Sequence, residues 1–252
     1  MLNIFHKEKI EKPFWDVDFH SHVCPGIDDG SPDPERSVTL VDGMRELGFR
    51  GMVLTPHIAE EEFPNTRETI DRSYARLREA LASAGSGMLT GVSAEYRMDP
   101  GFVRMMDDGT LRPLPGGKYI LVENSWFQEP AGIESIVYEL RDKFGYVPIL
   151  AHPERYTYYH RRPRRYRELA DLGMMLQVNI LSLSGYYGKD VKRIGESLVS
   201  DGLVSFLGSD LHRRTHLRAI REYFTSPDYR KLLRQSPRIL NSEVFADFLQ
   251  KP

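Results

Sequence analysis

The sequence contains almost no cysteine. Its single cysteine, Cys24, cannot form a disulfide within the chain, so nothing here requires an oxidising compartment. A cysteine-dependent phosphatase would need an arginine at position 30, in a loop that cradles phosphate, but that residue is Gly30. We therefore interpret Cys24 as a buried or supporting thiol and not as a nucleophile.

Long apolar runs and an excess of one charge are also missing. No run approaches the roughly 20 residues that span a bilayer, and residues 1–14 lack the apolar core of a signal peptide. A formal net charge of -2 gives no general attraction to nucleic acid or to anionic membranes. The basic segment 161–165 is the exception, either as a phosphate contact or as a solvated loop. We expect a cytoplasmic protein that neither inserts into membranes nor binds nucleic acid.

Seven short apolar runs alternate with helical stretches along the chain. The runs cover residues 15–19, 52–55, 88–94, 119–122, 147–151, 174–178 and 204–207. Caps, apolar stripes and closing glycines predict helices over 33–48, 66–84, 133–144, 164–172 and 191–200. Strands that alternate with helices favour a parallel sheet, and seven such units are near the size of a closed α/β barrel. An open doubly wound sheet is the alternative, but it would separate the outer strand ends.

We expect residues 1–252 to form one domain, with a core over about 15–218 and a helical C-terminal extension over 219–252. In that extension, helical stretches at 228–234 and 242–249 are expected to pack on the outside of the barrel. The sequence leaves the oligomeric state open.

Side chains that bind metals follow or close six of the seven runs. Barrel strands bring their C-terminal residues to one face, and imidazole with carboxylate suits divalent cations. Along the extended stretch 18–22, both histidines point to one side and can reach one ion. Glu95 and Glu123 close apolar strands, where an unpaired carboxylate would be costly. The nine candidate ligands are His20, His22, Asp29, His57, Glu95, Glu123, His152, Asp210 and His212. The other histidines considered, His6, His160 and His216, lack this context.

Several motifs resemble the polymerase and histidinol phosphatase (PHP) superfamily, and within it the bacterial protein-tyrosine phosphatases of capsular and exopolysaccharide synthesis. In family order they are DFHSHVCPGIDDGS at 18–31, TPHI at 55–58, SAEYRMD at 93–99, ILVENS at 120–125, LAHPERY at 150–156, LQVNILSLSGYYG at 176–188 and GSDLH at 208–212. HSHxxPGIDDG and AHPERY are specific to this branch. The resemblance implies a distorted seven-stranded TIM-like barrel, three divalent transition-metal ions and hydrolysis of phosphotyrosine on a bacterial tyrosine kinase. Manganese is the first expectation, with iron, zinc or cobalt as alternatives.

The same resemblance implies how the ligands share ions. One set is His20, His22, Glu95 and Asp210, a second is Glu95, Glu123 and His152, and a third is Asp29, His57 and His212, so that Glu95 bridges two ions. Asp28 stays an alternative to Asp29, because pattern alone does not separate adjacent loop residues. A water held between such ions loses its proton near neutral pH and can attack phosphorus, without a protein nucleophile.

Catalysis is expected to depend on Arg155, Asp210 and His57. Arg155 suits bidentate phosphate binding, with a structural salt bridge as the competing account. Family members carry a second phosphate-binding arginine after the last metal histidine, next to an asparagine. Here that segment reads HRRTHLR, so Arg213, Arg214 and Arg218 compete for the role. Aromatic side chains near the motifs could line a slot for the tyrosine ring: Phe63, Trp126, Phe127, Tyr156, Tyr158 and Tyr159.

Two other functions remain open from the sequence. One is a small-molecule phosphatase of the same superfamily, such as a histidinol phosphatase. The other is a non-catalytic, metal-bound module that docks on a kinase, against which the presence of all nine ligands argues. A nuclease is disfavoured by the acidic balance.

Overall fold

The computed structural model describes residues 10–250, and its strands are all paired in parallel. Three strands form one sheet in the order β1-β2-β4, and six form another in the order β3-β5-β6-β7-β8-β9. The strands are β1 (Val17–Asp18), β2 (Gly51–Leu54), β3 (His57–Ile58), β4 (Leu89–Val92), β5 (Glu95–Arg97), β6 (Tyr119–Glu123), β7 (Val147–Ala151), β8 (Met175–Asn179) and β9 (Val204–Gly208).

These nine strands lie in the seven predicted runs and the residues next to them. The second run contains β2 and leads into β3, and the third contains β4 and leads into β5, so each of these pairs lies on one nearly continuous segment. The first and last segments meet at a parallel bridge between Ser21 and Leu211, where the backbone N–H of His22 donates to the carbonyl of Leu211 at 2.9 Å. The two sheets are not one continuous hydrogen-bonded ladder, but their strands follow one another around a common interior. The predicted α/β fold with parallel strands is confirmed.

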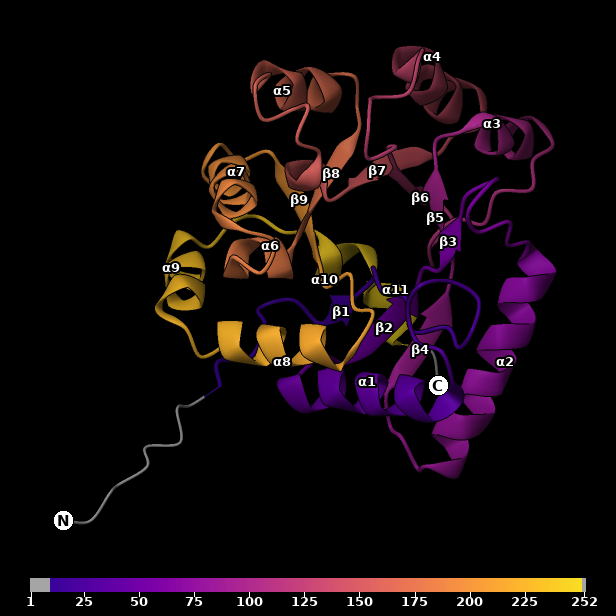
Figure 1. Cartoon of the computed structure of the whole chain (residues 1–252), viewed down its shortest axis with the longest axis vertical. Coiled ribbons are helices and arrows are strands. Elements are labelled where there is room, and N and C mark those ends of the chain that lie inside the picture. Colours follow the sequence, from indigo (N-terminus) through magenta and orange to yellow (C-terminus); the bar gives the residue numbers. More distant parts are fainter. Residues whose placement is uncertain (1–9, 251–252) are drawn as a thin grey trace.

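Helices surround the strands in Figure 1. They are α1 (Pro34–Leu47), α2 (Arg67–Ser83), α3 (Pro100–Asp107), α4 (Ile133–Tyr138), α5 (Arg164–Asp171), α6 (Ile180–Ser184), α7 (Lys189–Ser200), α8 (Arg214–Tyr223), α9 (Pro227–Gln235), α10 (Asn241–Val244) and α11 (Ala246–Leu249). The N-cap Asp33 accepts from the backbone N–H of Arg36 at 2.8 Å, and Gly48 ends α1 at φ 108°, as predicted. The stretch predicted as one helix over 133–144 changes after α4 into a π-helix, Glu139–Lys143.

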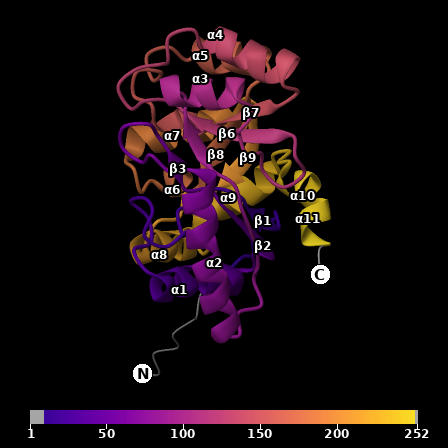
Figure 2. The ribbon, with the colours of Figure 1, turned by 90° about the vertical axis from the view of Figure 1, so that its right-hand side faces the viewer.

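The interior of the strand assembly is a separate apolar cluster. Strand side chains such as Val17, Val53 and Phe206 meet Phe245 and Phe248 from the C-terminal segment there. Figure 2 shows α10 and α11 at one end of the strands, next to β1 and β2. The expectation that the 242–249 helix packs on the outside of the barrel is therefore wrong, because its aromatic side chains cover the otherwise open interior.

Within the part of the chain that is described, no helix is both long and apolar enough to cross a membrane. The assignment of residues 1–252 to one domain stays a prediction.

Candidate metal centre

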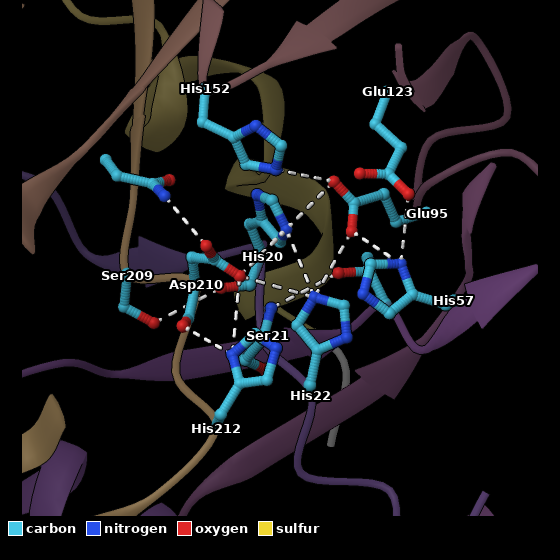
Figure 3. Close-up of polar contacts among 12 residues, drawn as sticks. His20, Ser21, His22, His57, Glu95, Glu123, His152, Ser209, Asp210 and His212 are labelled. Atoms are coloured by element: carbon cyan, nitrogen blue, oxygen red, sulfur yellow. Dashed lines mark hydrogen bonds and ion pairs between the residues drawn. The ribbon is translucent and has the colours of Figure 1, made fainter. Parts of the chain in front are cut away.

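Eight of the nine candidate ligands converge in Figure 3, and the ninth, Asp29, lies near His57 and His212. His20 and His22 follow β1, and Asp29 lies in the loop before α1. His57 follows β2 and begins β3, and Glu95 follows β4 and begins β5. The remaining ligands are Glu123 at the end of β6, His152 after β7, and Asp210 with His212 after β9. The structure thus brings together side chains that are far apart in the sequence: His20 and His212 are separated by 192 positions. Their role as ligands stays a prediction.

Three groups among them have ligand atoms within 4.8 Å of one another. The groups are His20, His22 and Glu95; His57, Glu95 and Glu123; and His22, Asp29, His57 and His212. Asp210 lies beside the first group, with its Oδ1 atom 3.5 Å from Nε2 of His20.

The second group differs from the expected set in one histidine. Nδ1 of His57 lies 3.2 Å from Glu95 and 3.4 Å from Glu123, whereas the expected set has His152 in this place. His152 is close as well, with Nε2 at 3.0 Å from Glu95. His57 therefore faces two groups, because its Nε2 atom lies 3.6 Å from Asp29.

The residues present fit bound cations. Nδ1 of His57, Oε2 of Glu95 and Oε2 of Glu123 are buried and make no hydrogen bond within residues 10–250. Nδ1 of His57 lies 3.2 Å from Oε2 of Glu95, so the two atoms are close enough to share one ion. A divalent cation between them would offset the cost of burying charged groups without hydrogen bonds. A donor set of imidazole and carboxylate is the one that borderline and hard divalent metals prefer.

The charges of the cluster favour the ionised carboxylates that ligation needs. Burial disfavours a charged imidazole, but the carboxylates of Glu95 and Asp210 outweigh it and raise the pKa of His20 to about 9. Burial would raise the pKa of Glu95, yet His20 and His57 hold it well below its ordinary value. Glu95 is thus ionised at neutral pH.

The structure separates Asp28 from Asp29. Asp28 accepts a hydrogen bond from Nδ1 of His22 at 2.9 Å and another from the backbone N–H of Gly30 at 3.0 Å. It therefore orients His22 with Nε2 turned towards the other ligands. Asp29 instead lies 3.4 Å from Nε2 of His212. Asp29 has the position of a ligand, and Asp28 that of a support.

A cleft with a volume of about 300 Å³ opens over the cluster, and arginines line it. Nη1 of Arg155 donates to Asp210 at 2.6 Å, and its guanidinium lies over the rings of Trp126 and Tyr187, 4.6 and 4.2 Å from their centroids. Arg213 also lines this cleft. Arg155 and Arg213 thus both line the cleft beside the candidate ligands.

The other two arginines of HRRTHLR point elsewhere. Nη2 of Arg214 donates to Thr39 at 3.4 Å, and Arg218 is exposed beside Glu222. Neither lines the cleft over the metal ligands. Of the three arginines in this segment, Arg213 is the one that lines the cleft, and its role in phosphate binding stays a prediction.

A further arginine, Arg97, lines the cleft and was not predicted. It donates to Glu123 through Nε at 3.2 Å and Nη2 at 3.0 Å, and to Glu62 through Nη1 at 2.7 Å. Alternation along β5 puts residues 95 and 97 on one side of the strand. That spacing after Glu95 is the signal that could have identified Arg97.

Only part of the predicted aromatic slot faces the cleft. Phe63 and Trp126 line it, stacked on His57 and His152 with centroids 5.1 and 5.4 Å apart. Tyr186 and Tyr187, which were not predicted, line it too. The other four candidates lie outside the cleft lining: Phe127, Tyr156, Tyr158 and Tyr159.

Residues 16–223 match the family model described as "Capsular polysaccharide synthesis, CpsB/CapC". The chain belongs to the CpsB/CapC family. The match covers most of the chain and confirms the resemblance that the motifs indicated.

Named relatives of this CpsB/CapC-family chain are tyrosine-protein phosphatases. It is 29% identical over 196 residues to tyrosine-protein phosphatase YwqE of Bacillus subtilis, across 78% of this chain and 77% of the relative. It is 26% identical over 205 residues to tyrosine-protein phosphatase CpsB of Streptococcus pneumoniae, across 78% and 82%.

Solved structures agree with the fold. A crystal structure from work on YwqE and CpsB, described as unique metal-dependent tyrosine phosphatases, matches with a TM-score of 0.74 at 26% identity, over 89% of this chain and 94% of the other. Histidinol phosphate phosphatase from Lactococcus lactis matches with a TM-score of 0.51 at 13% identity, over 83% and 92%, and this shows a shared fold.

In this family member, a line of buried amides supports the candidate ligands. Nδ1 of His20 donates to Gln177 at 2.7 Å, Gln177 donates to Asn179 at 2.8 Å, and Asn179 donates to Asp210 at 2.8 Å. A Cβ atom on Gly208 would lie 2.9 Å from Nε2 of Gln177, so glycine leaves room for this line. No ligand was predicted in the β8 run, and in the structure its Gln177 and Asn179 support the candidate ligands instead.

Two candidate ligands have left-handed backbone conformations. His152 has φ 38° and Asp210 has φ 51°, and the only other non-glycine residue with positive φ in residues 10–250 is Ser236. Such conformations cost of order 1–3 kcal/mol and gather at functional sites. They turn the chain sharply at the ends of β7 and β9, towards the other ligands.

The remaining sequence candidates are Cys24 and three histidines. Cys24 is buried, and burial raises the pKa of its thiol, which agrees with a supporting role. His160 contacts the carbonyl of Glu154 at 2.8 Å. His216 lines the cleft and accepts from the backbone N–H of His212 at 3.4 Å, and burial lowers its pKa to about 4. His6 lies outside the described residues.

Proposed function

We propose that this chain hydrolyses phosphotyrosine on proteins with the help of divalent metal ions. The observation that carries the proposal is the open cleft in which Arg155 and Arg213 stand over the nine converging ligands. A phosphate monoester needs positive charge on its oxygens and a positioned water; the arginines of the cleft supply positive charge, and ions held by the candidate ligands would supply the rest.

The proposed metal content is three ions, with manganese as the first expectation. His20, His22, Glu95 and Asp210 would hold one ion, Glu95 and Glu123 with His152 or His57 a second, and Asp29, His57 and His212 a third. When bound, such ions supply Lewis-acid activation of water and neutralise charge on the phosphate.

The chain's own residues would bind and orient the substrate. Arg155 lies over the rings of Trp126 and Tyr187, and its Nη1 atom donates to Asp210, which leaves its other N–H groups to bind phosphate oxygens. Arg213 would contact the phosphate from the side of α8. Phe63 and Trp126 would border the tyrosine ring. His57 and Asp210 would act as ligands of the ions that bind the phosphate and the water.

Phosphotyrosine fits a site without a dedicated general acid. A phenolate leaves without strong protonation, which lowers the demand for a proton donor. The arginines and aromatic rings of the cleft match a phosphorylated phenol in charge and shape. The partner that we propose is a tyrosine-phosphorylated protein, and more narrowly a bacterial tyrosine kinase of polysaccharide synthesis. The location of this chain in the cytoplasm stays a prediction.

The test compares two substrates on one protein sample of known metal content. We expect turnover of a phosphotyrosyl peptide to exceed that of histidinol phosphate, to disappear with a chelator, and to return with Mn²⁺. A preference for histidinol phosphate would instead support the small-molecule phosphatase. Bound metal without turnover of either substrate would support the kinase-docking module.

A further inference from the structure

We propose that a second cavity beside the metal cleft binds an acidic side chain of the substrate protein, next to the phosphotyrosine. This inference rests on the proposed function. The cavity has a volume of about 530 Å³ and lies between the loop before α1 and the start of α8. Asp29, His212 and Arg213 line both cavities, so a peptide whose phosphate reaches the metal centre would pass directly into the second cavity.

The charge of this second cavity is positive on balance. Arg36, Arg213 and Arg214 line it, and its one carboxylate, Asp29, faces His57 and His212 at 3.6 and 3.4 Å. The chain as a whole carries a formal charge of -2, so this concentration of arginine is local. An anion is the ligand that such a cavity favours.

The backbone at this place also favours an anion. Helices α1 and α8 lie side by side in Figures 1 and 2, and the cavity is lined by residues at both of their N-termini. Asp33 caps α1 through the N–H of Arg36, whereas no side chain caps α8 at Arg213. The first turn of α8 also carries no acidic residue. A carboxylate or phosphate of the substrate would supply this missing acceptor.

The remaining lining fits a peptide side chain better than a free ion. Pro32 and Leu40 contribute apolar surface beside the three guanidinium groups. The methylene groups of a glutamate, or the ring of a second phosphotyrosine, would pack there while the charged end met Arg36 and Arg214. Glutamate and phosphotyrosine are both anionic side chains, and peptides that carry one or the other distinguish between them.

Peptides that share one phosphotyrosine test the proposal. One series places a single glutamate or a second phosphotyrosine at each neighbouring position, and a reference peptide has serine there. We expect kcat/KM to rise about tenfold, equal to about 1.4 kcal/mol, at one or two positions only. The double variant Arg36→Gln/Arg214→Gln should lose this gain and keep the kcat/KM of the reference peptide.

Arg193→Gln is the matched control. Its side chain is 64% exposed and pairs with an aspartate three residues earlier in α7, as the 63% exposed Arg36 pairs with Asp33. It lies outside both cavities, and its variant should keep the preference.

Different failures have different meanings. Equal kcat/KM for all peptides, or a preference that survives the double variant, would overturn this inference alone. A similar increase in kcat/KM at every peptide position would overturn it too, because it would indicate a general electrostatic attraction between the peptide and the protein and not binding in one cavity. No turnover of any phosphotyrosyl peptide by metal-loaded protein would overturn the proposed function, and this inference with it.

Discussion

Asp210 joins the candidate metal ligands to the arginine of the cleft. Its Oδ1 atom lies 3.5 Å from Nε2 of His20 and 3.4 Å from Nε2 of His22, while its Oδ2 atom accepts from Arg155 at 2.6 Å and from Asn179 at 2.8 Å. One carboxylate thus faces both the proposed first ion and the proposed phosphate clamp. We therefore expect catalysis to depend more on the negative charge of Asp210 than on the shape of its side chain.

Asp210→Asn removes that charge and replaces one acceptor oxygen with an NH2 group, which cannot bind a cation or accept from Arg155. Asparagine has the same size and tolerates the left-handed conformation of this position, so the variant should fold. We expect kcat/KM on a phosphotyrosyl peptide to fall by at least about 100-fold, the order seen when one charge-stabilising group is lost. Peptide kinetics and elemental analysis check this. Unchanged kinetics with full metal content would contradict the role of Asp210.

Arg155→Lys tests the geometry of the clamp at constant charge. Lysine keeps the positive charge but loses the planar fork and its stacking between Trp126 and Tyr187. We expect a fall in kcat/KM of roughly 10- to 100-fold, corresponding to the roughly 1.5–3 kcal/mol of a charged hydrogen bond. Metal content should not change. If the lysine variant kept full activity, a positive charge alone would be enough for phosphate binding, and bidentate binding by Arg155 would be excluded.

Helices α10 and α11 close the end of the strand assembly opposite the metal centre. Their segment buries Phe245 and Phe248 in the interior cluster with Val17, Val53 and Phe206. Gly51 in β2 and Gly91 in β4 make room for this, because a Cβ atom on either would lie 2.9 Å from the Phe248 ring. The C-terminal segment is thus part of the core that supports the strands.

Phe248→Ala should therefore destabilise the protein strongly. Removing a buried phenylalanine costs about 3–5 kcal/mol, through lost burial and the cavity left behind. Urea denaturation of the metal-loaded protein measures the change in the free energy of unfolding. Phe127→Ala is the control, since Phe127 is 90% exposed and its loss should change that free energy by less than about 0.5 kcal/mol. Equal effects of the two variants would show that Phe248 does not fill the interior.

Across the whole molecule, the candidate ligands connect the ends of six of the seven strand segments. A cation bound at these residues would link parts of the chain that are far apart in sequence. Because the ligand geometry exists only in the folded chain, binding free energy adds to the free energy of unfolding.

Removal of metal should lower the melting temperature. At a free metal concentration of 100 times Kd, one site stabilises by about 2.7 kcal/mol, which for a chain of this size is about 5–10 °C. Calorimetry with a chelator, and again after adding Mn²⁺, measures this shift. The variant Glu95→Gln removes a shared ligand and should show a much smaller shift. Equal melting temperatures with and without metal would argue against binding at this centre.

The sequence alone determined the order of strands, the ligand types and the family. Candidate ligands at the ends of six of the seven runs are visible because parallel strands point the same way, so His57 and Glu123 are expected on one face without knowledge of their contacts. Helix ends such as Asp33 and Gly48 were predictable for another reason: a helix cap depends only on residues that are neighbours in the sequence. Motifs shared with relatives added the resemblance that the family match confirmed.

Only the tertiary structure decided how these side chains meet. Asp28 and Asp29 are equivalent by pattern, and the hydrogen bond from His22 to Asp28 distinguishes them. The direction of Arg213 depends on where α8 packs beside α1, and the place of Phe248 depends on space left by distant strands. Local sequence does not encode these contacts, because each arises between segments that meet only when the whole chain folds.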